Sequence, residues 1–176
     1  IEIATDISLR VDDVLKGDME AGEHITVRKL GGAVTVEEYL QSMEDAGITY
    51  WNAEELKAEY SEEERRENYI QISFCDLDPV IGQKSLYFLE KDAEKELYYR
   101  LCDGFGQYVE TASGEYVNAY EIADEKRNAD EPMMLALGET VEFDPDAAPG
   151  ERINIYTMDE IKEGMETHTA PPTDYP

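Results

Sequence analysis

Basic residues and histidine are scarce in this sequence. Lys and Arg number 15 against 42 Asp and Glu, which gives a formal net charge of −27, and there are two histidines. Contacts with phosphate backbones and anionic lipid need Lys or Arg, so this charge excludes general nucleic-acid binding. His24 sits next to a turn and His168 lies near the chain end, away from any candidate nucleophile in sequence. Histidine chemistry is therefore not expected.

Long apolar runs and catalytic motifs are also missing. No stretch approaches the ~20 apolar residues of a transmembrane helix, and no basic segment followed by an apolar one opens the chain. The chain starts at Ile1 with strand-like sequence and no initiator Met, which fits export after removal of a signal segment. No G-x-S-x-G, HExxH or phosphate-binding glycine loop occurs. The sequence therefore names no reaction.

Cysteine is limited to Cys75 and Cys102. Strand alternation puts both on the more polar side of their segments, so a disulfide is geometrically possible if the two strands are neighbours, as an exported protein would favour. The alternative is two unpaired thiols that behave as small hydrophobic side chains. Two cysteines and two scattered histidines do not fit a zinc site, and no cofactor is expected.

Tyrosine is abundant, with 12 residues against 4 Phe and 1 Trp. A Tyr ring can be buried while its hydroxyl reaches water or a partner, so these residues compensate for a modest aliphatic content. A chain of 176 residues most simply forms one domain. We expect this domain over residues 1–165, followed by a Pro-rich flexible tail over 166–176.

Alternating apolar residues predict strands along most of the chain. A hairpin is expected within residues 1–30, and residues 84–90 are apolar on both faces, which is typical of a central, covered strand. The other expected strands are 69–75, 97–102, 107–111, 116–120, 140–143 and 152–156.

Capping-box patterns predict helices in two regions. Thr35 with Glu38 and Asn52 with Glu55 start two short helices, and Ser61 with Glu64 restarts the second; together they form a helical insertion at 33–68. Thr157 with Glu160 caps a final helix, whereas 121–132 is interpreted as a charged connection.

Two segments resemble a known kind of domain. Residues 11–32 read V-D-D-V-L-K-G-D-M-E-A-G-E-H-I-T-V-R-K-L-G-G, and residues 82–90 read G-Q-K-S-L-Y-F-L-E. Together they resemble a secreted or lipid-anchored domain of unknown function from Gram-positive bacteria, and the OB-like barrel of netrin-like and tissue-inhibitor-of-metalloproteinase domains. The resemblance implies a mainly β fold with minor α: a five-stranded OB-like barrel with a short helical insertion and a C-terminal β/α extension. The Cys-x-Cys opening of the inhibitors is missing, so protease inhibition is not carried over.

Aromatic residues supply the candidate binding site. Tyr98, Phe105 and Tyr108 lie on or between consecutive expected strands, and barrels of this kind often bind extended ligands across one sheet face. At strand spacing the same rings also fit a hydrophobic core, which is the more common arrangement.

A calcium site is a weaker candidate. Asp144, Asp146 and Glu151 stand in one loop and could supply oxygen ligands, although solvated surface acids, which are common in a chain of this composition, explain them better.

We therefore expect an exported, secreted or lipid-anchored, non-enzymatic binding module at the bacterial cell surface, with a protein or a glycan as its partner. One alternative is a hydrolase that recruits carboxylates from distant strands. Another is a structural spacer on the cell surface.

Overall fold

The structure is a computed structural model that describes residues 3–48, 52–72, 77–129, 134–137, 139–141 and 153–167. Contacts between residues divide the chain into two compact units. The first unit comprises Ile1–Thr5 and Lys29–Phe74, and the second comprises Asp6–Arg28 and Cys75–Pro176. Each unit has its own cluster of buried apolar side chains. A single domain over residues 1–165 stays a prediction.

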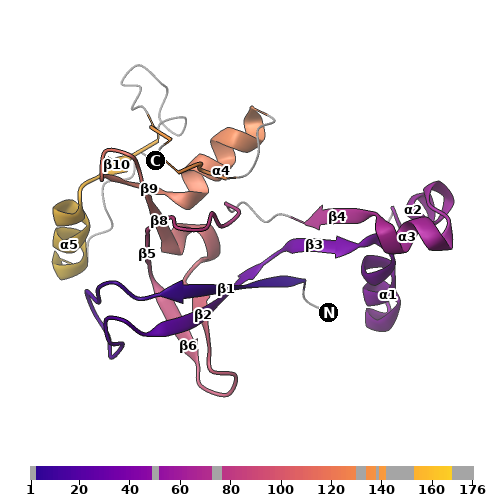
Figure 1. The fold of residues 1–176 in the computed structure, drawn as a ribbon, viewed down its shortest axis with the longest axis horizontal. Helices are drawn as coiled ribbons and strands as arrows, with labels where there is room; N and C mark the ends of the chain where they lie inside the picture. The colour runs from indigo at the N-terminus through magenta and orange to yellow at the C-terminus, as the bar shows by residue number, and fades with distance from the viewer. Residues whose placement is uncertain are drawn as a thin grey trace. The chain divides into compact units, whose positions relative to one another are not determined.

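The first unit combines a two-stranded antiparallel sheet with three helices (Figure 1). Strand β3 (Gly32–Thr35) pairs antiparallel with β4 (Tyr69–Ile72), and the helices are α1 (Val36–Ala46), α2 (Ala53–Glu59) and α3 (Glu62–Glu67). Val36, Leu40 and Met43 of α1 pack with Ala53 of α2, at the i, i+4, i+7 spacing of one helix face. The helices therefore lie where the capping patterns place them.

Two of the three predicted caps in this unit are confirmed. Thr35 and Ser61 each form a complete capping box with the Glu three residues later, which satisfies the first backbone N–H groups of α1 and α3. The helix start predicted at Asn52 is confirmed, since Asn52 is the N-cap position of α2, but its side chain accepts no hydrogen bond from the start of the helix. Its backbone is already in the helical region instead of the extended region that a capping residue adopts.

Two four-stranded sheets account for the remaining described strands. One has the order β1 (Ala4–Arg10), β2 (His24–Leu30), β7 (Leu97–Arg100), β6 (Leu89–Asp92), with β2 and β7 parallel. The other has the order β10 (Ile155–Tyr156), β9 (Tyr116–Asn118), β8 (Gln107–Glu110), β5 (Ser85–Tyr87), all antiparallel.

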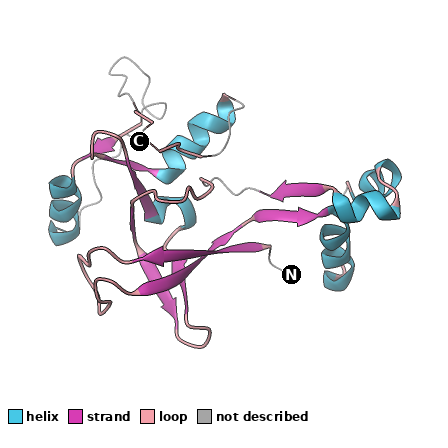
Figure 2. Cartoon of the chain, viewed as in Figure 1, coloured by secondary structure: helices cyan, strands magenta, loops and turns pink. Residues whose placement is uncertain are grey.

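The β-rich character with several sheets is confirmed, and Figure 2 shows strands and helices along the whole described chain. The helices nevertheless hold slightly more of the described residues than the strands do. No closed barrel forms among the described strands, so the five-stranded OB-like barrel is not confirmed.

One long hairpin belongs to both four-stranded sheets. Strands β5 and β6 are consecutive and are separated by Phe88, whose N–H donates to the carbonyl of Gly106 and whose carbonyl accepts from the N–H of Leu101, both at 2.8 Å. Opposite this single residue the partner strand makes an excursion over residues 101–106, the 101–106 loop. Such excursions bend a strand and pass it from one sheet to the next.

The central position predicted for residues 84–90 is wrong. In the order of the described strands, β5 ends one sheet and β6 ends the other. The segment is apolar on both faces because its two halves belong to different sheets. It is not a single strand that lies between two neighbouring strands.

Helix α4 (Ala119–Asn128) replaces the charged connection expected at 121–132, which corrects that prediction. Asn118 caps it by accepting from the N–H of Tyr120. The inward face is formed by Ala119, Ile122, Ala123 and Lys126 at helical spacing, and the last helix, α5 (Met158–Thr167), follows the predicted Thr157 cap. Because this face holds two alanines and a lysine beside a single large apolar residue, the periodicity of apolar residues does not predict the helix.

The 101–106 loop leaves no room for a side chain at Gly106. A Cβ there would collide with the carbonyl oxygen of Leu101, which is backbone and cannot move aside. We expect Gly106→Ala to lower the free energy of unfolding by roughly 1–3 kcal/mol or more. Denaturant unfolding followed by circular dichroism measures this change.

Gly114→Ala is the matched control. An added Cβ at Gly114 meets open space and is opposed only by a φ of +82°. A loss of stability in Gly106→Ala no larger than in this control would contradict the packing described for the loop.

Candidate functional site

The 101–106 loop presents Phe105 on a fixed backbone. Within the loop, Cys102 adopts a left-handed conformation with φ 53° and is followed by the 3-10 helix η1 (Asp103–Gly106). The N–H of Phe105 donates to the carbonyl of Cys102 at 3.2 Å, and Gly104 and Gly106 are buried beneath the turn. The glycines let the chain turn tightly while the ring between them points outward.

Phe105 and Tyr120 form a stacked pair, called here the Phe105 platform. Their ring centroids are 4.1 Å apart and their planes differ by 19°. The Phe105 side chain is 50% exposed, although one face of its ring lies against Tyr120. The opposite face of the ring is therefore open to a ligand.

The side-chain amide of Asn118 bonds to the backbone of both residues of the platform. The Nδ2 of Asn118 donates to the carbonyl of Phe105 at 3.1 Å, and its Oδ1 accepts from the N–H of Tyr120 at 3.0 Å. Asn118 is itself buried at the end of β9. The loop and the first turn of α4 are thereby fixed to the same residue.

The three aromatic residues predicted as a binding site have different surroundings. Phe105 is exposed, whereas Tyr108 on β8 is half-buried with edge-to-face contacts to Phe88 at 6.1 Å and Tyr156 at 5.8 Å. Tyr98 on β7 is half-buried with Lys91 Nζ 5.6 Å from its ring centroid. Of the three, only Phe105 therefore has a largely exposed ring, whereas Tyr108 packs against Phe88 and Tyr156.

Glu121 is a half-buried carboxylate in the first turn of α4. It accepts from the backbone N–H of Asn154 at 2.8 Å and from its Nδ2 at 2.9 Å. Removal from water raises the pKa of Glu121, while the two bonds from Asn154 oppose this change. Burial also raises the pKa of Tyr108, a hydrogen bond with Asn118 opposes this, and the charge of Glu121 raises it further.

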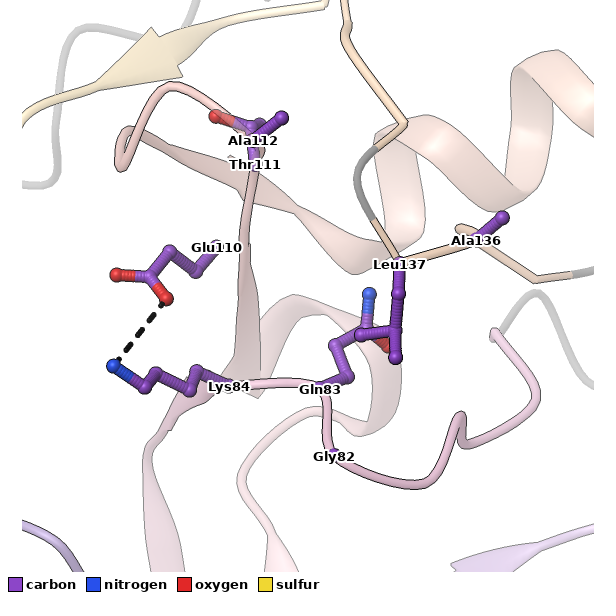
Figure 3. Close-up of a pocket in the computed structure, with 8 residues that line it drawn as sticks. All are labelled: Gly82, Gln83, Lys84, Glu110, Thr111, Ala112, Ala136 and Leu137. Carbon is purple, nitrogen blue, oxygen red and sulfur yellow. Dashed lines mark ion pairs between the residues drawn. The ribbon is translucent and has the colours of Figure 1, made fainter.

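A shallow hollow of about 170 Å³ lies elsewhere in the second unit (Figure 3). It is lined by residues 82–84, 110–112, 136 and 137. Lys84 and Glu110 form a long ion pair of 3.9 Å at its rim, and the Gln83 side chain already donates to the carbonyl of Leu135. The hollow offers no exposed aromatic ring, so we take the Phe105 platform as the better candidate binding surface.

The remaining predicted sites concern cysteine and calcium. Cys102 is exposed, and its predicted partner Cys75 lies outside the described residues, so the disulfide stays a prediction. Asp144, Asp146 and Glu151, the calcium candidates, also lie outside them. Within the ranges that the structure describes, no three His, Cys, Asp or Glu side chains are grouped to hold a metal ion.

None of the helices in the described part of the chain is both long enough and apolar enough to cross a membrane.

Comparisons with protein families, with curated proteins and with solved structures found no match to this chain. The resemblance drawn from residues 11–32 and 82–90 therefore stays a prediction.

The sequence analysis did not identify two residues near the platform: Asn118, which bonds to the Phe105 carbonyl, and Glu121, which bonds to Asn154. Asn118 and Glu121 carry no motif, and Glu121 meets Asn154 across more than thirty positions of sequence. The one local signal for this region is Asn118 followed by a segment that contains Ala and Glu, a pattern that indicates the start of a helix.

The raised pKa of Glu121 makes stability depend on pH. The folded state holds this proton more tightly than the unfolded state, whose pKa is near the ordinary value of 4.5. The resulting stabilisation is complete below that value and is lost as the pH rises through the higher pKa of the folded state. The free energy of unfolding of the wild type minus that of Glu121→Gln should therefore fall across this window.

Urea unfolding at a series of pH values tests this dependence, with Glu125→Gln on the exposed side of α4 as the control for loss of one negative charge. A wild-type minus Glu121→Gln difference that stays constant or grows with pH would show that burial does not govern this carboxyl group.

Proposed function

We propose that this chain is an exported, non-enzymatic binding module of the Gram-positive cell surface, secreted or lipid-anchored, that binds a protein or a glycan through the Phe105 platform. The observation that carries the proposal is the open face of Phe105, held by Tyr120 and Asn118. Rigid exposed aromatic side chains are the usual centres of binding energy at interfaces. They lose little conformational freedom when a partner binds.

The scaffold proposed for this module is OB-like. Support comes from the motif resemblance and from the bent hairpin of residues 85–110, in which Phe88 passes the chain between two sheets. Small barrels turn their corners in this way. The cell-surface location rests on the motif resemblance alone.

A hydrolase is the rival proposal, and Glu121 is the observation that favours it. A half-buried carboxyl group with a raised pKa is a frequent feature of catalytic sites. Both oxygens of Glu121, however, accept hydrogen bonds from Asn154, which joins α4 to the segment before β10. This arrangement supports a role in holding the fold, so we favour the binding module.

The proposal predicts that Phe105→Ala weakens binding without unfolding the protein. Loss of a central aromatic contact costs about 1–2 kcal/mol, or about five- to thirtyfold in Kd. Binding of the full chain is measured to purified Gram-positive peptidoglycan and, separately, to purified surface proteins, with circular dichroism to check the fold. Tyr69→Ala is the matched control, because Tyr69 is 70% exposed on β4, outside the platform.

Equal binding by wild type and Phe105→Ala would remove the platform from the binding site. Absence of binding to every target, together with hydrolysis of a glycan that Glu121→Gln abolishes, would favour the hydrolase instead. A structural spacer would show neither binding nor hydrolysis.

A further inference from the structure

The open face of Phe105 has a defined chemical character. Aromatic rings carry partial negative charge on their faces, and Tyr120 stacked behind Phe105 leaves one such face pointing outward. The loop backbone is fixed by hydrogen bonds from Asn118 and to Cys102. The ring is therefore held in one orientation, as recognition of a flat or cationic group requires.

The net charge of the chain, together with one carboxylate on the same helix, favours a cation at the platform. Asp124 lies four residues after Tyr120 and is therefore on the same side of α4. Its carboxylate forms an ion pair with Arg127 at 3.5 Å. The ion pair is exposed and long, so it contributes little and can exchange partners. The net charge of −27 adds a long-range attraction for basic partners and repels anionic ones.

We infer that the open face of Phe105 binds an arginine side chain from a basic segment of a partner protein; this inference rests on the binding role proposed for the platform. The planar guanidinium stacks on the Phe105 ring and its N–H groups reach toward Asp124. Arginine fits better than lysine because its flat group matches the ring face. A neutral sugar could stack on the same ring, yet it would gain nothing from the acidic surroundings.

The experiment titrates the isotope-labelled full chain with three probes and follows backbone amide signals by NMR. The probes are a capped octapeptide of alternating Gly and Arg, the same peptide with neutral citrulline in place of Arg, and a tetrasaccharide of N-acetylglucosamine. The expected result is saturable shifts at residues 101–106 and 120–124 with the Arg peptide, and loss of these shifts with citrulline.

Two substitutions at Phe105 separate a cation–ring contact from an apolar one. Phe105→Leu keeps apolar bulk but removes the ring, and should weaken the Kd of the Arg peptide about two- to fivefold, whereas Phe105→Trp should maintain or strengthen it. Tyr69→Leu, which removes an exposed ring elsewhere, should leave this Kd unchanged. Because all variants have the same net charge, general attraction to the acidic chain cancels in these ratios.

Three results would overturn the inference. Shifts spread over the acidic surface and equal in wild type and Phe105→Leu would mean attraction by net charge alone. Equal affinity for the Arg and citrulline peptides would mean an apolar or backbone contact. Binding of the tetrasaccharide at residues 101–106 in place of the Arg peptide would leave the proposed binding module intact with a glycan partner. The proposed function itself fails only if Phe105→Ala also leaves binding to the cell-surface targets unchanged.

Discussion

The two backbone hydrogen bonds of Phe88 close both ends of the 101–106 loop, and the rest of the candidate site depends on this closure. The bonds to Leu101 and Gly106 satisfy both backbone polar groups of Phe88 at the point where the chain passes from one sheet to the other. Between these ends the chain forms a tight turn over buried glycines. Exposure of Phe105 is thus a consequence of strand pairing, and not of a flexible surface loop.

Local signals in the sequence predicted much of the fold. The capping boxes at Thr35, Ser61 and Thr157 are confirmed because each depends only on residues within one helical turn. Helix α4 was missed because its inner face consists largely of alanine. The central position of 84–90 was wrong because apolar residues on both faces describe a strand shared by two sheets equally well. Alternation alone cannot distinguish these cases.

The candidate site was less accessible from sequence. Phe105 was one of three aromatic residues predicted from their place on or between consecutive strands, and its binding role stays a prediction. Its difference from Tyr108 and Tyr98 comes from tertiary neighbours: Tyr156 packs on Tyr108, and Lys91 covers Tyr98. Burial of Glu121 likewise depends on a segment distant in sequence, and no pattern within α4 indicates it.

The double role of Asn118 constrains how this surface could change over time. Its amide must donate to the Phe105 carbonyl and accept from the Tyr120 N–H at once, which neither an aspartate nor a hydrophobic residue can do. The rings can be exchanged for other aromatic residues more easily than the amide that places them. In related proteins that keep this surface, we therefore expect substitutions at positions 105 and 120 to change which partner is bound, whereas Asn118 and Gly106 should be retained.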